Sequence, residues 1–282
     1  KQQQQQQKQQ PQTQQNIPIV IYFHGGGMAK ASCFDQNFQT FGRMIASNGV
    51  IVVMVDFRNS TVPSREGEPI SPYPGGLNDC VSSVRWVVAN RSFVGGSSQS
   101  RVILAGESGG GNLSIAAGLK LKDVGEISLI HGIYAMCPFI SGNYNVDANG
   151  LNAKYPSISK YTKGGFGGIV LTNEFMQTCA VGYGDNCRND KYAWPSNCTQ
   201  DDIHGLCPIT ISLNEFDPLI DEGKEFYRKC LQSNVDARCI IVQGTVHATD
   251  SYFVGTHPRV SRATACAIAS FAKGIEEGKT IL

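Results

Sequence analysis

Two glycine-rich segments carry residue types that together can activate a serine. The first, His24-Gly25-Gly26-Gly27, directly follows the apolar run Ile19 to Phe23, and the second, Gly106-Glu107-Ser108-Gly109-Gly110, directly follows Val102 to Ala105. The second is a G-x-S-x-G pattern, in which a strand enters a turn so sharp that only glycine is tolerated beside the serine. Such a turn lifts the Ser108 hydroxyl clear of the sheet, where a histidine and a substrate carbonyl can both reach it. The sequence therefore predicts a nucleophilic serine at this position.

A serine nucleophile of this kind needs a histidine base and an acid that orients the histidine. Asp217 follows the strand-like run Ile209 to Phe216, and His247 follows the run Cys239 to Gly244 after a short loop. The order serine, acid, histidine is expected when the three residues stand at the carboxyl ends of successive parallel strands. We therefore predict Ser108, Asp217 and His247 as a catalytic triad.

The other histidines have simpler interpretations. His24 belongs to the glycine-rich loop, and His131 lies inside a predicted buried strand, where it packs in the core. His204 falls in a loop-rich stretch, and His257 precedes a proline in a surface-like loop. His247 is therefore the expected base.

The rival acids are also predicted to be structural. Glu107 is fixed inside the sharp turn and points away from Ser108, and Glu215 alternates to the other face of its strand. Asp221 is typical of a helix start, with Glu222 in the first turn.

Attack of a serine on an acyl carbonyl creates an oxyanion, and glycine-rich backbone can supply the N–H donors that stabilise it. We expect three such donors, two from Gly25, Gly26 and Gly27 and one from Gly109. Each donor in such a hole is worth on the order of 100-fold to 1,000-fold in rate. The two motifs thus predict the two halves of one active site.

The elements around these motifs alternate between short β-branched runs and helical patterns, which predicts an α/β fold with a mostly parallel central sheet flanked by helices. The near-continuous apolar character of the strands indicates that both faces are buried. The expected strands are Ile17 to Phe23, Val50 to Phe57, Val102 to Ala105, Ser128 to Met136, Pro208 to Phe216 and Arg238 to Gln243. The expected helices are Phe34 to Ser47, Gly76 to Ala89, Asn112 to Lys122, Asp221 to Ser233 and Arg262 to Glu276.

Two stretches depart from this alternation of strand and helix patterns. Residues 1–16 form a low-complexity Gln-rich tract that we expect to be disordered, which leaves residues 17–282 as one catalytic domain. Residues 141–206 are rich in Gly, Asn and aromatic side chains, and we interpret them as an inserted lid or cap. Their aromatic residues either line a substrate pocket over Ser108 or only hold the insertion onto the core. The glycine run 164–168 is either a hinge or a plain loop.

Composition excludes several classes of protein. A net charge of +1 with 17% charged residues leaves no basic stripe for nucleic acid, and no apolar run approaches the roughly 18 residues of a transmembrane segment. The chain begins with Lys rather than Met and shows no leader, which is consistent with a fragment or a processed form and leaves the localisation unknown. The sequence also leaves the oligomeric state open.

Eight of the ten cysteines fall into two groups. Those on predicted helices or strands indicate plain packing, namely Cys80, Cys137, Cys230 and Cys239. A second group clusters in one loop-rich stretch without any C-x-x-C pair, namely Cys179, Cys187, Cys198 and Cys207. One or two disulfides or free thiols fit this second group better than a zinc site does. We predict no metal.

These motifs resemble those of the hormone-sensitive-lipase-like esterases, a branch of the α/β-hydrolases with H-G-G-G ahead of G-[DE]-S-[AG]-G-G. The resemblance covers about Ile17 to Ala272, and further matches are Val55 to Arg58, Tyr73 to Asp79, Phe216 to Gly223 and Gly244 to His247. The resemblance implies an α/β-hydrolase fold and a carboxylesterase that cleaves short to medium acyl esters through an acyl-enzyme. It assigns Ser108, His247 and Asp217 to the triad and the glycines named above to the oxyanion hole. It implies a small-molecule ester as the substrate and no metal or organic cofactor.

Some segments depart from the family pattern and leave the substrate open. The segment Asn59 to Pro63 replaces the usual L-A-P-E, Ala248 and Thr249 replace G-F, and the Gln-rich tract offers no counterpart of the family's cap and first strands. The same machinery can cleave an amide or a lactone. A non-catalytic small-molecule receptor, similar to the plant gibberellin receptors, is a further alternative, although His247 is kept here.

Overall fold

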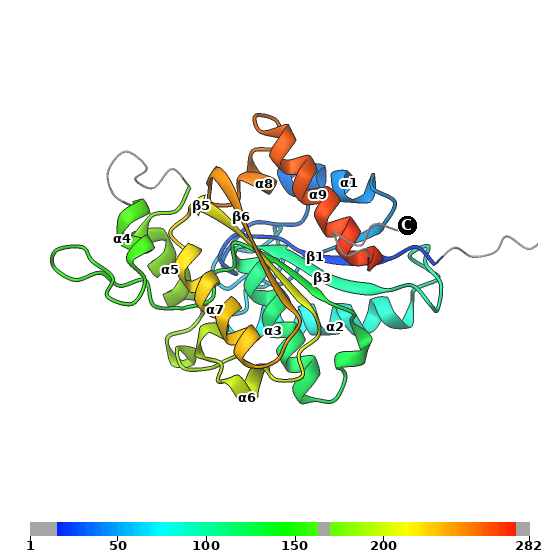
Figure 1. Cartoon of the computed structure of the whole chain (residues 1–282), viewed down its shortest axis with the longest axis horizontal. Helices are drawn as coiled ribbons and strands as arrows, with labels where there is room; N and C mark the ends of the chain where they lie inside the picture. Colours follow the sequence, from blue (N-terminus) through cyan, green and yellow to red (C-terminus); the bar gives the residue numbers. More distant parts are fainter. Residues whose placement is uncertain (1–15, 163–169, 275–282) are drawn as a thin grey trace, which may run out of the picture.

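The computed structural model describes residues 16–162 and 170–274, and within them six strands form one fully parallel sheet (Figure 1). The strand order across the sheet is β2-β1-β3-β4-β5-β6. The strands are β1 Ile19–Phe23, β2 Ile51–Val55, β3 Val102–Glu107, β4 Ile133–Met136, β5 Ile209–Phe216 and β6 Ala237–Val246. Because every pair is parallel, the loops at the carboxyl ends of all strands emerge along one edge of the sheet.

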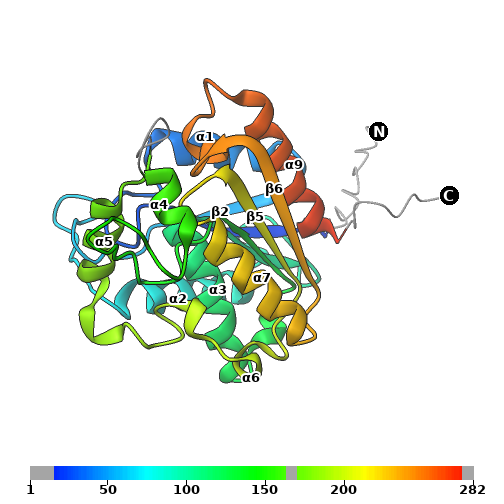
Figure 2. The ribbon, with the colours of Figure 1, turned by 60° about the vertical axis from the view of Figure 1, so that its left-hand side comes forward.

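Helices cover both faces of the sheet (Figures 1 and 2). One face carries α1 Gln36–Ala46 and α9 Pro258–Lys273, with the short α8 Thr249–Tyr252 beside them. The other face carries α2 Gly75–Ala89, α3 Gly109–Asp123 and α7 Ile220–Gln232. The expected α/β architecture, a parallel sheet between two helical layers, is confirmed.

The packing of β1 on both faces explains why its sequence is apolar throughout. Ile19, Ile21 and Phe23 belong to the core beneath α2, α3 and α7, whereas Val20 and Tyr22 belong to the core beneath α1 and α9. Successive side chains of a strand point to opposite faces, so a strand with helices on both faces has no polar side. All five side chains are fully buried.

The predicted strand Ser128 to Met136 was wrong in its first half. A single 3-10 turn, Ile127–Leu129, precedes β4, and it packs against α2 and α3 instead of pairing with β3. His131 therefore lies before the strand and is only half-buried, and its Nδ1 accepts a hydrogen bond from the Val102 amide at 3.2 Å. The prediction that His131 lies inside a buried strand was therefore wrong.

Residues 141–206 connect β4 to β5, and their described part contains helices but no strand. The helices are α4 Pro156–Thr162, α5 Asn173–Tyr183 and α6 Gln200–Ile203, with 3-10 turns at Asp185–Cys187 and Pro195–Asn197. Four aromatic side chains of this segment, Tyr144, Tyr155, Tyr183 and Trp194, are almost fully buried in the same core as α3. These four support the packing interpretation, and a role of the segment as a lid stays a prediction.

All ten cysteines are free thiols, so the disulfides considered for Cys179, Cys187, Cys198 and Cys207 are absent. These four thiols are buried among apolar side chains of the core that also contains α3. Residues 1–15 of the Gln-rich tract 1–16 lie outside the described residues, and so does the glycine run 164–168.

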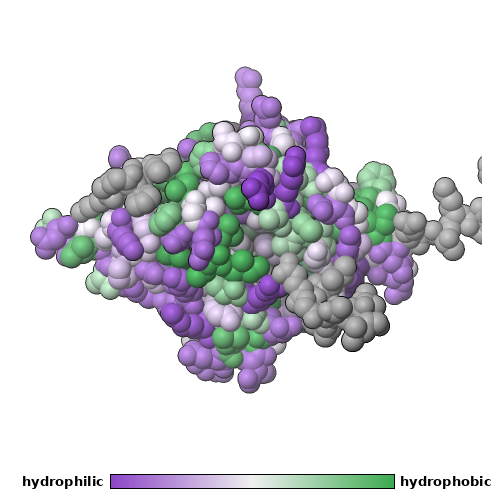
Figure 3. Space-filling model, turned by 45° about the horizontal axis from the view of Figure 1, so that its top comes forward, coloured by the Kyte–Doolittle hydropathy of each residue, from purple (hydrophilic) through white to green (hydrophobic). Residues whose placement is uncertain are grey.

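Figure 3 shows that hydrophilic side chains cover much of the displayed face, with hydrophobic patches between them. Across residues 16–162 and 170–274, the helices are too short or too polar to span a bilayer.

Candidate active site

The turn between β3 and α3 holds Ser108 in a strained conformation. Its φ of 55° and ψ of −118° are unusual for a residue with a side chain. Glycine is required on either side, because a Cβ on Gly106 would lie 2.5 Å from the Gly110 carbonyl oxygen and a Cβ on Gly110 would lie 2.0 Å from the Phe23 carbonyl oxygen. The sharp turn expected from G-x-S-x-G is therefore present.

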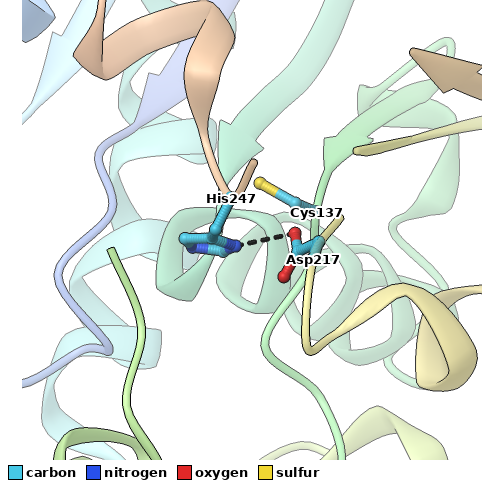
Figure 4. Close-up of side chains that lie close together, drawn as sticks. All are labelled: Cys137, Asp217 and His247. Atoms are coloured by element: carbon cyan, nitrogen blue, oxygen red, sulfur yellow. Dashed lines mark hydrogen bonds and ion pairs between the residues drawn. The ribbon is translucent and has the colours of Figure 1, made fainter. Parts of the chain in front are cut away.

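Asp217 and His247 form a buried pair (Figure 4). The Nδ1 atom of His247 lies 2.8 Å from the Oδ2 atom of Asp217, and the two side chains are 3% and 1% exposed. The other carboxylate oxygen of Asp217 accepts the Leu219 amide at 2.9 Å, which fixes the carboxylate on the turn after β5. Held in this way, the imidazole presents its Nε2 atom away from the acid.

The nucleophile turn and the pair meet at Cys137, the residue that follows β4. The Ser108 amide donates to the Met136 carbonyl at 2.9 Å, and the Cys137 amide donates to the Ser212 carbonyl on β5 at 2.7 Å. The Cys137 Sγ, a nitrogen of His247 and a carboxylate oxygen of Asp217 all lie within 4.8 Å of one another (Figure 4). The carboxyl ends of β3, β4, β5 and β6 thus bring the predicted triad segments to one place.

Cys137 is the residue of this site that the sequence interpretation missed, because it was assigned to plain packing. It has a positive φ of 33° and is 1% exposed. Burial and the neighbouring Asp217 carboxylate raise the pKa of its thiol well above the usual value. Its position directly after a strand, like that of Ser108 and Asp217, was the signal that could have found it.

The glycine-rich loop after β1 lies against the nucleophile turn, and the structure narrows the choice of oxyanion donors among its three glycines. The Gly25 amide donates to Glu107 Oε1 at 2.6 Å, so this N–H is already occupied. Gly26 and Gly27 have positive φ values of 108° and 66°. A Cβ on Gly109 would lie 2.9 Å from the Gly27 nitrogen, which shows how closely the loop approaches the turn. The candidate donors are therefore Gly26, Gly27 and Gly109.

Glu107 joins the loop to the turn. Its carboxyl is 1% exposed and binds the Gly25 amide through Oε1 and the Tyr22 hydroxyl through Oε2. Burial raises the pKa of Glu107 to about 8, against the opposing effect of these hydrogen bonds. The expectation that Glu107 is structural agrees with these contacts, but its link to the glycine-rich loop depends on tertiary structure.

His24 also holds this loop. Its Nδ1 lies 2.7 Å from the Gly25 carbonyl oxygen, and its ring stacks on Phe57 with the centroids 4.2 Å apart. Burial lowers the pKa of His24, which favours a neutral ring. His204 contacts the Ser233 carbonyl, and His257 is exposed at the start of α9. Each expectation for these three histidines agrees with the structure.

The rival acids bind other groups. Glu215 accepts the Gly244 amide at 2.7 Å, and Asp221 accepts the Ser157 amide at 2.8 Å. Glu222 is fully buried, and its Oε1 accepts the Ile140 amide at 2.7 Å and the Tyr144 hydroxyl at 3.1 Å. Burial raises the pKa of Glu222 to about 8.

Comparison with known proteins agrees with this fold. The sequence model of the alpha/beta hydrolase fold family matches residues 20–251. The chain belongs to this family. Within it, the α/β-hydrolase chain is similar to brefeldin A esterase, described as a bacterial homologue of human hormone-sensitive lipase, with 34% identity and a TM-score of 0.83 over 92% of this chain and 69% of that one. The hormone-sensitive-lipase-like resemblance is confirmed.

Two further relatives are esterases. The structure of esterase Est22 superposes with a TM-score of 0.84 and 46% identity, and covers 94% of this chain and 75% of that one. Carboxylesterase NlhH of Mycobacterium tuberculosis is 27% identical over 215 residues, which are 74% of this chain. The α/β-hydrolase chain spans 59% of the length of that carboxylesterase.

Proposed function

We propose that the chain is a serine carboxylic ester hydrolase that acts through a Ser108 acyl-enzyme. The observation that carries the proposal is the Asp217–His247 pair, buried at 2.8 Å on the edge of the sheet where the strained Ser108 turn also lies. A buried carboxylate on Nδ1 fixes the tautomer in which Nε2 is free to accept a proton. The esterase relatives support this reading of the site.

In the first half-reaction, His247 Nε2 takes the Ser108 hydroxyl proton while Oγ bonds to the ester carbonyl carbon. The carbonyl oxygen becomes an oxyanion facing the amides of Gly26, Gly27 and Gly109. The imidazolium formed on His247 is stabilised by Asp217 at 2.8 Å. It then gives its proton to the alkoxy leaving group as the carbon–oxygen bond breaks, and the acyl-enzyme remains.

In the second half-reaction, His247 takes a proton from water, whose oxygen adds to the acyl carbon. The tetrahedral intermediate collapses, the Ser108 oxygen leaves with the proton from His247, and the carboxylic acid is released. The side chains of this chain supply every proton transfer, so the scheme needs neither a metal nor an organic cofactor.

The substrate is proposed to be a small ester with a short to medium acyl chain, by analogy with the family. An amide or a lactone can be cleaved through the same steps, and the outcome depends on the leaving group. A receptor without catalysis is disfavoured because the Asp217–His247 pair is intact.

The proposal is tested with a p-nitrophenyl ester and with a fluorophosphonate probe that labels activated serines. Ser108→Ala should lower kcat by roughly 10⁴-fold or more and abolish labelling, because the covalent step is lost. Ser82→Ala, a matched change at an exposed serine on α2, should leave both unchanged. Wild-type turnover that survives Ser108→Ala would refute the nucleophile assignment. Folded wild-type protein that neither turns over esters nor reacts with the probe would indicate a binding protein.

A further inference from the structure

The thiol of Cys137 stands beside the proposed acid and base, where a hydrolase triad needs no sulfur. Its Sγ, a nitrogen of His247 and a carboxylate oxygen of Asp217 lie within 4.8 Å of one another, and all three side chains are buried (Figure 4). Thiolate, imidazole and carboxylate are the three protein ligand types that bind zinc. The group therefore has the composition and the spacing of a three-ligand zinc site.

We propose that Cys137, Asp217 and His247 form an inhibitory site for a soft or borderline divalent cation such as Zn²⁺. The proposal rests on the proposed function, since it regulates the same triad. Three protein ligands with a fourth position open to water are typical of an accessible zinc site.

The required movement is small. With zinc bonds of about 2.0 Å to nitrogen and oxygen and tetrahedral angles, the two ligand atoms of His247 and Asp217 stand about 3.3 Å apart. They now stand 2.8 Å apart, so the pair has to open by about 0.5 Å. A sulfur bonded at about 2.3 Å would stand about 3.6 Å from the nitrogen. The Cys137 Sγ now lies within 4.8 Å of a nitrogen of His247, so the sulfur has to approach by at most about 1.2 Å.

The surrounding backbone favours this arrangement. The positive φ of 33° at Cys137 fixes the start of the turn after β4, and the Cys137 amide is bound to Ser212 of β5 at 2.7 Å. Asp217 keeps the Leu219 amide on Oδ1 at 2.9 Å, which leaves Oδ2 for the cation. Cys137 and Asp217 are thus attached to rigid strand ends. Binding of the cation has to release the proton of the Cys137 thiol to water and move the proton between His247 and Asp217 to Nε2 of the imidazole.

Occupancy of this site would stop catalysis by a defined route. A metal-bound imidazole is neutral and carries one ring proton, so a cation on Nδ1 of His247 forces that proton onto Nε2. An imidazole that carries a proton on Nε2 cannot accept the proton of Ser108. The cation would also occupy the carboxylate oxygen that stabilises the imidazolium. Inhibition should therefore lower kcat and be reversed by a chelator.

The test is a titration of p-nitrophenyl ester hydrolysis with Zn²⁺ for wild type, Cys137→Ser and Cys137→Ala, each compared with its own rate without metal. Loss of an outer-shell partner already weakens metal binding by about 10-fold to 100-fold, so loss of the thiolate should weaken inhibition by at least about 100-fold. Cys266→Ser is the matched control, because Cys266 is the exposed thiol on α9 and its removal should not change inhibition. EDTA should restore wild-type activity.

A second readout does not depend on activity. Cd²⁺ bound to a thiolate gives an ultraviolet charge-transfer absorbance, which wild type and Cys266→Ser should show more strongly than either Cys137 variant. Equal zinc sensitivity in wild type and Cys137→Ser, or equal cadmium absorbance in the two, would overturn the proposal. If wild type fails to hydrolyse esters, the proposed function has failed, and the cadmium difference alone decides whether the site exists. The alanine variant keeps the test valid if the serine variant does not fold.

Discussion

Removal of the Glu107 carboxyl should separate the glycine-rich loop from the nucleophile turn. The carboxyl binds the Gly25 amide at 2.6 Å and the Tyr22 hydroxyl, and it is 1% exposed. Glu107→Ala leaves both donors buried without an acceptor. Glu107→Gln keeps the carbonyl oxygen for Gly25 and is the neutral counterpart of a carboxyl whose pKa is raised to about 8 by burial.

The sizes of the two effects follow from these contacts. Each buried donor left unpaired costs about 1–3 kcal/mol, so Glu107→Ala should lower the free energy of unfolding by about 2–6 kcal/mol. A loop released at Gly25 misplaces the neighbouring amides of Gly26 and Gly27, and one lost oxyanion donor lowers kcat by about 100-fold to 1,000-fold. KM should change little, because the oxyanion exists only in the transition state and the intermediate.

The assay compares kcat and KM for wild type, Glu107→Ala, Glu107→Gln and Tyr22→Phe, with urea unfolding of each. Tyr22→Phe removes one partner of the carboxyl but leaves the Gly25 contact, so its kcat should fall by less than about 10-fold, since no oxyanion donor is displaced. Glu107→Gln should lie close to wild type in kcat. A folded Glu107→Ala variant with kcat within a factor of about three of wild type would refute the reasoning, because it would show that the loop keeps its donors without the carboxyl.

Three further predictions concern the triad, the turn and a second buried acid. Asp217→Asn should keep the fold but lower kcat by about 10⁴-fold, because it favours the wrong tautomer of the histidine; steady-state kinetics with circular dichroism as the control test this. Gly110→Ala should destabilise the protein by at least about 1–3 kcal/mol in urea unfolding, because its Cβ would lie 2.0 Å from the Phe23 carbonyl oxygen, whereas Gly255→Ala, with open space around the position, should be neutral. Glu222→Gln should weaken the loss of unfolding free energy that we expect as the pH rises toward about 8. The pKa of Glu222 is raised to about 8, so above about pH 4.5 the unfolded chain releases a proton that the folded chain keeps, and stability present at low pH is lost as the pH rises to about 8. The contribution of Glu222 to this slope is at most about 1.4 kcal/mol per pH unit, and an unchanged slope in the variant would show that Glu222 does not contribute to it.

The amino-acid sequence by itself determined the fold and the identity of the predicted triad. Apolar runs of strand length, separated by helical patterns, favour a parallel sheet that is covered by helices. Parallel strands end at one edge, so residues that directly follow separate strands are brought together whatever their distance in the sequence. This is why Asp217 and His247 could be paired before their separation of 2.8 Å was known. The nucleophile turn was predictable from its glycines, because a turn that sharp excludes a Cβ at the positions beside the serine.

Tertiary structure alone decided the contacts that Gly25, Cys137 and His131 make. The sequence offered Gly25 as an oxyanion donor, but its amide is bound to Glu107, which is 82 positions away. Cys137 looked like a packing residue, yet the short strand β4 delivers it to the Asp217–His247 pair. His131 fell outside its predicted strand because neighbouring apolar residues pack on helices instead of pairing. Periodicity reports which face a residue occupies, whereas contacts between loops depend on the packing of several elements at once.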